Sequence, residues 1–289
     1  MNAVQRLIDE MKCRNYAAKT TTEYAASIRR LGTHFGCCPS QLSLEQIRAY
    51  QLHLIQEKHI SWSHYNNEMA AIRLLYLKVL QYDWPMEQLP YAKRGRELPV
   101  VLSRHEVFQL WRPLRQLKRR LLLMTAYSAA LRVSELVHLR VEDLDGERML
   151  IRIPQQGCRP ERFVPYSPTL RQRLGPYLAD HRSPWLFSGS SSERPLRTSA
   201  AGAICRHAAE ISQFEKPVTL YTLRHSAAVH CVEMGVNPRT LQKVLGHDRL
   251  SSTMRYIQVT YQPQTTLVHP LDLLSQEARD DDTSPQADA

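Results

Sequence analysis

Residues 221–256 read YTLRHSAAVHCVEMGVNPRTLQKVLGHDRLSSTMRY, a stretch that predicts short helices on tight connections. Thr222 is a suitable cap for a first helix, and Gly235 is a natural helix stop behind it. Asn237, followed by a proline, favours the start of a second helix, which then ends at Gly246. A third, shorter helix is expected after it. The pattern therefore predicts three helices separated by tight turns.

Four polar side chains on this stretch suit phosphate chemistry. They are Arg224, His225, His247 and Tyr256. A guanidinium can hold two phosphate oxygens, and a tyrosine hydroxyl can attack phosphorus. Two short helices joined by a tight turn are also typical of a helix-turn-helix DNA reader. The stretch alone leaves both interpretations open.

The charge of the chain indicates a polyanionic partner. The 289 residues carry a formal charge of +10, and the six acids and one base from residue 271 onward contribute −5, which leaves +15 on the rest. A body this basic favours nucleic acid over a membrane surface as the partner. The six cysteines form no Cys-x-x-Cys pair, so neither a zinc site nor a disulfide framework is indicated. We therefore expect no metal. The sequence shows no signal peptide and no membrane-spanning apolar run, so we expect a cytoplasmic protein.

Residues 1–86 predict a small helical bundle. Four segments carry apolar residues at helical spacing, and Ser43 with Gln46 forms a capping box at the start of the third. Residues 87–102 follow as an extended linker, whose basic cluster, Lys93, Arg94 and Arg96, could pass over a DNA backbone.

Residues 103–262 predict a second, mostly helical domain. Ser103 opens it with another capping box, and the helix near residues 119–129 is nearly all apolar and therefore expected to be buried. Arg132 comes directly after it. An arginine there either pairs with Glu135 or Glu142 or faces a functional pocket.

Two runs within that domain, 148–153 and 161–166, alternate as β-strands do and predict a small antiparallel hairpin. A further helix is expected near 199–211. Residues 263–289 end in an acidic stretch of disordered composition. The predicted fold is therefore mainly α, with an N-terminal helical bundle and a mostly helical second domain that contains a small sheet.

The polar residues, taken in order, resemble those of the tyrosine recombinases, the lambda-integrase and Xer-type class. The motifs are LRVSEL with Arg132, LRHS with Arg224, LGH with His247, and Tyr256 nine residues later. The resemblance covers nearly the whole chain short of the acidic tail, with the first bundle similar to the core-binding domain of that family.

The resemblance implies a catalytic role for each of these residues. Arg132 and Arg224 would clamp the scissile phosphate of double-stranded DNA, and His247 would hydrogen-bond it. Tyr256 would attack to give a 3′-phosphotyrosine, so that rejoining needs no nucleotide or other cofactor. It also implies a homo-oligomer, a tetramer on DNA.

Two positions depart from the family pattern. Tyr221 stands where a histidine is usual, and a tyrosine can still donate a hydrogen bond. The usual hairpin lysine, which protonates the leaving oxygen, is missing. Gly157 or Gln156 stands in its place, and nearby Arg159 holds its proton too tightly to be a good acid.

We therefore expect a site-specific DNA recombinase or integrase of a mobile element. One alternative is a catalytically weakened copy that binds DNA, with cleavage slowed about 10²–10⁴-fold by the missing lysine. A helix-turn-helix regulator is another, although it would leave Arg132 and the hairpin unexplained.

Overall fold

The structure, a computed structural model, describes residues 2–92, 98–157 and 159–260, and it divides into two compact units. We call Met1–Arg96 the N-terminal unit and Glu97–Ala289 the C-terminal unit. The basic cluster expected at Lys93, Arg94 and Arg96 lies outside the described residues, as does the acidic tail.

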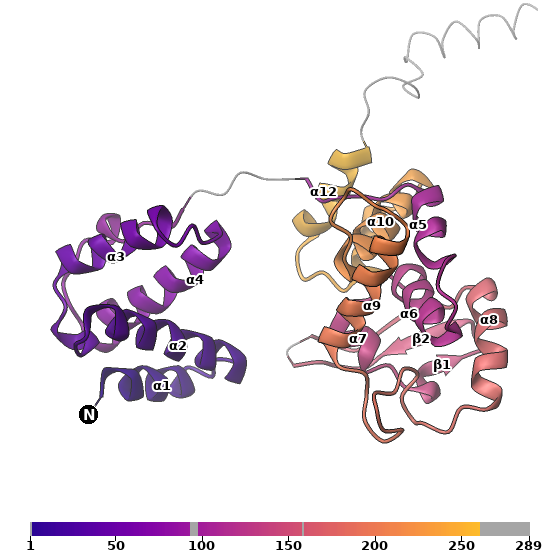
Figure 1. Cartoon of the computed structure of the whole chain (residues 1–289), viewed down its shortest axis with the longest axis horizontal. Helices are drawn as coiled ribbons and strands as arrows, with labels where there is room; N and C mark the ends of the chain where they lie inside the picture. Colours follow the sequence, from indigo (N-terminus) through magenta and orange to yellow (C-terminus); the bar gives the residue numbers. More distant parts are fainter. Residues whose placement is uncertain (1, 93–97, 158, 261–289) are drawn as a thin grey trace, which may run out of the picture. The chain divides into compact units, whose positions relative to one another are not determined.

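The N-terminal unit consists of helices throughout its described part (Figure 1). They are α1 (Ala3–Cys13), α2 (Ala18–Phe35), η1 (Pro39–Gln41), α3 (Leu44–Gln56), α4 (Trp62–Arg73), the π-helix η2 (Leu74–Val79) and η3 (Met86–Gln88). The predicted capping box is confirmed, because the Ser43 side chain accepts from the Gln46 N–H and the Gln46 side chain accepts in return. Gly36 ends α2 in the left-handed conformation, with φ 66°. Leu7, Ile28 and Ile72 lie fully buried in the core between these helices.

The C-terminal unit combines helices with one small sheet (Figure 1). Its helices are α5 (Arg104–Trp111), α6 (Leu117–Ser128), α7 (Val133–Val137), η4 (Val141–Asp143), α8 (Pro168–Ala179), α9 (Thr198–Ile211), α10 (Leu220–Glu233), α11 (Pro238–Leu245) and α12 (Leu250–Thr260). As expected from its composition, α6 contributes to the core, with Leu121, Leu122 and Leu123 fully buried.

The sheet has one strand more than the predicted hairpin. Strands β2 (Leu150–Ile153) and β3 (Arg162–Pro165) pair antiparallel, and β1 (Leu144–Asp145) pairs with the other edge of β2. Two residues give β1 too little sequence for an alternating pattern, which explains why the sequence did not reveal it.

Three helices carry the stretch 221–256, as predicted, but the third, α12, has 11 residues and is longer than α11 with 8, so the expected shorter third helix is wrong. The cap of α10 is Thr219, whose hydroxyl accepts from the N–H of Thr222, so the predicted cap Thr222 is wrong by one helical turn. The caps of α11 are as predicted, with the Asn237 side chain accepting from Arg239 and with Gly246 left-handed at φ 59°.

Candidate active site

One buried carboxylate, that of Glu135 on α7, organises the polar cluster of the C-terminal unit. Arg132 directly precedes this short helix, and its backbone N–H and its Nη1 donate to the two Glu135 oxygens, each over 2.8 Å. Its Nη2 donates over 2.6 Å to the carbonyl oxygen of Gly246, at the end of α11. The sequence left Arg132 as either an ion-pair partner or a pocket residue, and the structure shows the pairing with Glu135.

Two further arginines complete the cluster. Arg162 on β3 donates to both oxygens of Glu135, over 2.8 and 2.9 Å, and to the Val244 carbonyl over 2.8 Å. Arg224 on α10 is only 2 % exposed, and it donates to the carbonyl oxygens of Ala130 and Leu245 over 2.5 and 2.6 Å. Its Nη1 lies 3.8 Å from Glu135. The three guanidiniums are thereby fixed against one carboxylate and the end of α11.

The charges of this cluster do not cancel. Burial alone would raise the pKa of the Glu135 carboxyl, but the hydrogen bonds and charge of Arg162, with the bonds from Arg132, bring it to about 2. Burial and the neighbouring Arg132 lower the pKa of Arg224 to about 10, which leaves it cationic at neutral pH. Three positive groups and one negative group give a net charge of +2. Such a site is prepared for an anion whose charge grows during reaction.

Tyr256 on α12 lies beside this cluster and is 2 % exposed. Its hydroxyl is 2.9 Å from Nδ1 of His225, and its ring stacks against that of His247 with centroids 6.2 Å apart. Nδ1 of His247 is in turn 2.9 Å from the Thr253 hydroxyl. The sequence gave His225 no specific role among the four polar side chains, and the hydrogen bond to Tyr256 makes it a partner of the phenol.

Burial and positive charge keep both histidines neutral. Burial first, and then the charges of Arg224 and Arg255, lower the pKa of His225 to about 4. Burial, followed by Arg224 and Arg132, lowers the pKa of His247 to about 4 as well. Burial raises the pKa of Tyr256 above its ordinary value, although Arg224 and Arg255 oppose the rise. At neutral pH the site therefore holds a phenol and two neutral imidazoles.

The remaining expected residues lie at the edge of this cluster. Tyr221 is half exposed with its ring centroid 5.7 Å from that of His225, and its hydroxyl has no hydrogen-bond partner among the described residues. In the β2–β3 turn, Gln156 and Arg159 pair through their backbones, and Gly157 has φ 61°. The Gln156 side chain donates to the Ser134 carbonyl, whereas Arg159 lines the cavity that also contains His247.

Arg162 is the site residue that the sequence motifs did not indicate. It shares one face of the strand region with buried Val164 and Tyr166, because strand side chains alternate. An arginine on the inward face of a strand has to be paired. That alternation was the available signal, but it could not indicate which carboxylate would be the partner.

Nothing in the described part of the chain looks like a metal site, since no group of three or more His, Cys, Asp or Glu side chains there could hold an ion. Within the same residue ranges, none of the helices combines the length and apolar character needed to cross a bilayer.

Comparison with known proteins matches both units to known domain families. Residues 101–263 match the phage integrase family, and residues 4–86 match a phage integrase N-terminal SAM-like domain. The "Putative integrase/recombinase y4qK" of Sinorhizobium fredii is 36% identical over 276 residues, which are 95% of this chain and 90% of that protein. The tyrosine recombinase XerA of Pyrococcus horikoshii is 33% identical over 187 residues, which are 64% of this chain and 66% of the XerA chain. Among solved structures, the Tn1549 transposon integrase in complex with transposon right end DNA has a TM-score of 0.71 at 18% identity, covering 96% of this chain and 99% of that one. The last likeness concerns the fold.

Proposed function

The chain belongs to the phage integrase family, and we propose that it is a site-specific DNA recombinase that cuts and rejoins DNA through a 3′-phosphotyrosine. The observation that carries this proposal is the position of Tyr256. Its hydroxyl is hydrogen-bonded to Nδ1 of His225, beside the cluster with net charge +2. A phenol, a neutral base and fixed cations are what transfer of a phosphodiester to tyrosine requires.

Each residue then has a defined role. Arg132 and Arg224 hold the non-bridging oxygens of the scissile phosphate, and Glu135 and Arg162 position them. If the Thr253 hydroxyl donates to Nδ1 of His247, the Nε2–H of that ring is left to donate to the phosphate. Tyr256 attacks phosphorus while Nδ1 of neutral His225 takes its proton.

The substrate is double-stranded DNA, and the acting form is a homo-oligomer, a tetramer when two duplexes are joined. The formal charge of +10 over the whole chain favours DNA contact, as does the similarity in fold to the Tn1549 integrase, which was solved in complex with DNA. We place the protein in the cytoplasm and assign the cluster Lys93, Arg94 and Arg96 to the DNA backbone.

Covalent capture of DNA tests this function. The full chain is incubated with sheared genomic DNA of its source organism, and complexes that survive boiling in detergent are isolated and sequenced. We expect capture at a discrete site by the wild type and none by Tyr256→Phe, with equal non-covalent binding by both. Capture that persists in Tyr256→Phe would remove the tyrosine from its role, and capture spread evenly over the genome would argue against site specificity.

A catalytically weakened DNA-binding protein is the second candidate. The observation in its favour is the β2–β3 turn, where no lysine occurs and Gln156 is tied to Ser134 instead. This candidate predicts tight, salt-sensitive binding at a discrete site with no covalent complex from either protein.

A further inference from the structure

Cleavage of a DNA strand by Tyr256 releases a 5′-oxygen, and this alkoxide has to receive a proton. The residues around the phenol are poor donors. Arginine ordinarily holds its protons too tightly to act as an acid. Arg224, whose pKa falls to about 10, already donates from both Nη atoms to the carbonyl oxygens of Ala130 and Leu245. With pKa values of about 4, His225 and His247 are neutral at pH 7 and are better suited to accept a proton than to give one. The cluster that binds the phosphate therefore contains no evident proton donor.

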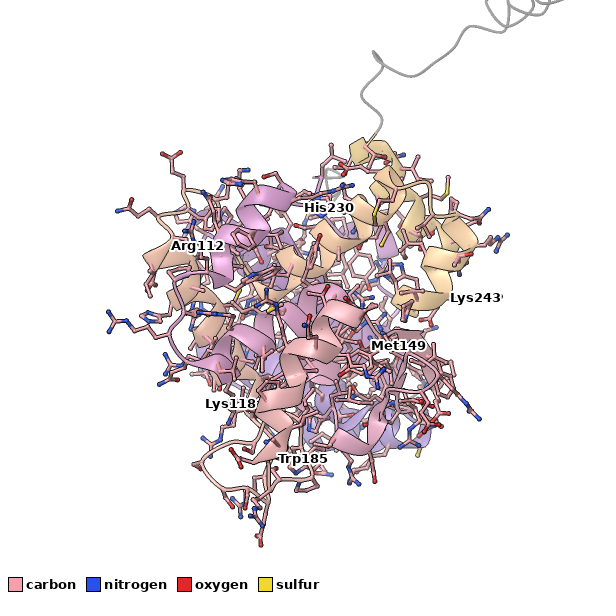
Figure 2. All side chains as sticks on the ribbon, turned by 90° about the vertical axis from the view of Figure 1, so that its right-hand side faces the viewer. Arg112, Lys118, Met149, Trp185, His230 and Lys243 are labelled. Atoms are coloured by element: carbon pink, nitrogen blue, oxygen red, sulfur yellow. The ribbon has the colours of Figure 1, made fainter. Side chains whose placement is uncertain are left out.

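The C-terminal unit has three lysines, and two of them are committed elsewhere. Lys118 donates over 2.6 Å to the carbonyl oxygen of Ser188, and Lys216 pairs with Glu106 over 2.7 Å. Lys243 is exposed, and its ammonium group has no hydrogen bond or ion pair among the described residues. Figure 2 shows Lys118 and Lys243 well apart on the unit, with Lys243 at its surface.

Lys243 shares a cavity with part of the candidate active site. It lines a cavity of about 450 Å³ together with His247, Arg159 and Arg162. It lies in the last turn of α11, one helical turn before His247. This end of the helix is fixed, because Arg162 and Arg224 bind the carbonyl oxygens of Val244 and Leu245, the two residues that follow Lys243. Lys243 thus lies at a fixed helix end and lines the same cavity as His247.

We propose that Lys243 is the general acid that protonates the leaving 5′-oxygen. This rests on the proposed function above. In the step, the bond from Tyr256 Oη to phosphorus forms and the bond from phosphorus to the 5′-oxygen breaks. The phenolic proton moves to Nδ1 of His225, and a proton from Nζ of Lys243 moves to the 5′-oxygen. Both protons return when the strand is rejoined.

A sulfur atom in place of the bridging 5′-oxygen tests this assignment, because a thiolate leaves without a proton. The cleavage position is first mapped with the wild-type full chain, and nicked duplexes with oxygen or sulfur at that position are then cleaved by each variant. We expect Lys243→Ala and Lys243→Arg to cleave the oxygen substrate about 10²–10⁴-fold more slowly than wild type. On the sulfur substrate both should come within about threefold of wild type, the signature of a lost general acid.

Arg239→Ala is the matched control, because Arg239 lines the same cavity and is also cationic. It should slow both substrates by the same factor through weaker DNA binding. Equal slowing of both substrates by Lys243→Ala, restored by Lys243→Arg, would overturn the proposal and leave an electrostatic role. Unchanged cleavage of the oxygen substrate would overturn it as well. If the wild type cleaves neither substrate, the recombinase function itself fails, which is a distinct result.

Discussion

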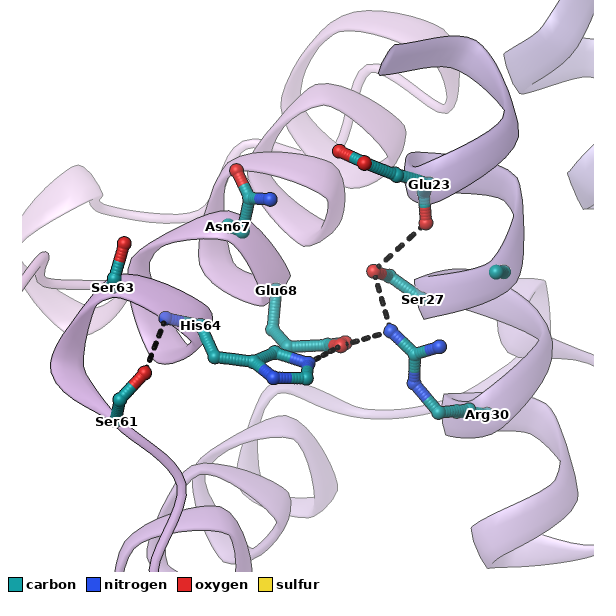
Figure 3. Close-up of a pocket in the computed structure, with 9 residues that line it drawn as sticks. Glu23, Ser27, Arg30, Ser61, Ser63, His64, Asn67 and Glu68 are labelled. Atoms are coloured by element: carbon teal, nitrogen blue, oxygen red, sulfur yellow. Dashed lines mark hydrogen bonds and ion pairs between the residues drawn. The ribbon is translucent and has the colours of Figure 1, made fainter. Parts of the chain in front are cut away.

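Each unit of the molecule contains a buried glutamate that pairs with arginine, and the two pairs are built differently. In the C-terminal unit, Glu135 has hydrogen bonds on both oxygens and lies against three guanidiniums. In the N-terminal unit, Glu68 on α4 receives Arg30 and lies 3.2 Å from Nε2 of His64, both through the same oxygen (Figure 3). Its other oxygen is buried and finds no hydrogen-bond partner in the part of the chain that the structure describes.

The arginines differ as much as the carboxylates. The Arg132 and Arg162 side chains are each 11 % exposed, whereas that of Arg30 is 50 % exposed at a cavity of about 430 Å³. A saturated carboxylate holds several cations in one geometry, which suits the binding of a transition state. A half-satisfied carboxylate with a solvated partner can exchange that partner for another donor at little cost. We infer that the first cluster is preorganised and that the second is adaptable.

Removing the charge of Glu135 should have the largest effect. Glu135→Gln leaves three buried or nearly buried guanidiniums without their counter-ion, and breaking a buried pair in this way costs about 3–5 kcal/mol. We expect the unfolding free energy of the C-terminal unit to fall by that amount, measured by hydrogen exchange of its helices. The N-terminal unit provides the internal reference. A loss below about 1 kcal/mol would contradict the preorganised cluster.

The helix-ending glycines of the two units give a matched pair of variants. Gly36 and Gly246 both have positive φ, at 66° and 59°. A Cβ on Gly36 would meet no atom of the described residues within 4 Å, whereas one on Gly246 would lie 3.0 Å from Cδ and Nε of Arg162. Gly36→Ala should therefore cost only the left-handed strain, about 1–2 kcal/mol. Gly246→Ala adds displacement of Arg162 from Glu135 and should cost about 2–4 kcal/mol.

Covalent DNA capture distinguishes the two glycine variants further. Gly246→Ala should reduce the amount of captured DNA, while Gly36→Ala should leave the C-terminal site and the capture unchanged. Equal costs in the two units, with equal capture, would mean that Arg162 moves aside freely and that its place in the cluster is not fixed.

Local signals in the sequence predicted the elements that depend on neighbouring residues. The capping boxes at Ser43 and Ser103 and the caps of α11 form where they were expected. Each is set by residues no more than four positions apart, so the sequence contains the whole cause. The helix α8 was not predicted, since a glycine and Pro176 interrupt its pattern and only Leu170 and Leu174 are buried.

The contacts of the candidate site depend on residues far apart in the chain. Arg132 and the Gly246 carbonyl are 114 positions apart, and Arg162 and the Val244 carbonyl are 82 apart. The motifs indicated Arg132, Arg224, His247 and Tyr256, and Glu135 was one expected partner of Arg132. They did not indicate that Glu135 would also hold Arg162 or that His225 would bind the phenol. Long-range contacts of this kind follow from packing, which no short motif records.

Acidification should weaken the C-terminal unit between pH 6.5 and about 4. The folded unit keeps the pKa of both His225 and His247 at about 4, below the ordinary value of 6.5. In this window the unfolded chain binds more protons, so stability falls as the pH falls, and above pH 6.5 the contribution is constant. Allowing for partial exposure of both rings, we expect the melting temperature of the unit to fall by roughly 5 °C from pH 7 to pH 5. His225→Gln should reduce this fall, and an undiminished fall would mean that other groups cause it.

Removing the charge of Glu68 should have the smallest effect, although this carboxylate is as buried as Glu135. Glu68→Gln breaks the pair with Arg30, but Arg30 is half exposed and is solvated by water instead. The substitution also removes the cost of a buried charged oxygen that has no hydrogen-bond partner among the described residues. We expect a change in the unfolding free energy of the N-terminal unit of about 1 kcal/mol or less. Arg30→Gln in the same background should add little, because a weak pair has a small coupling energy. A cost near that of Glu135→Gln, or a coupling above about 2 kcal/mol, would show that the buried carboxylate is fully committed to Arg30 and that the two clusters are equivalent after all.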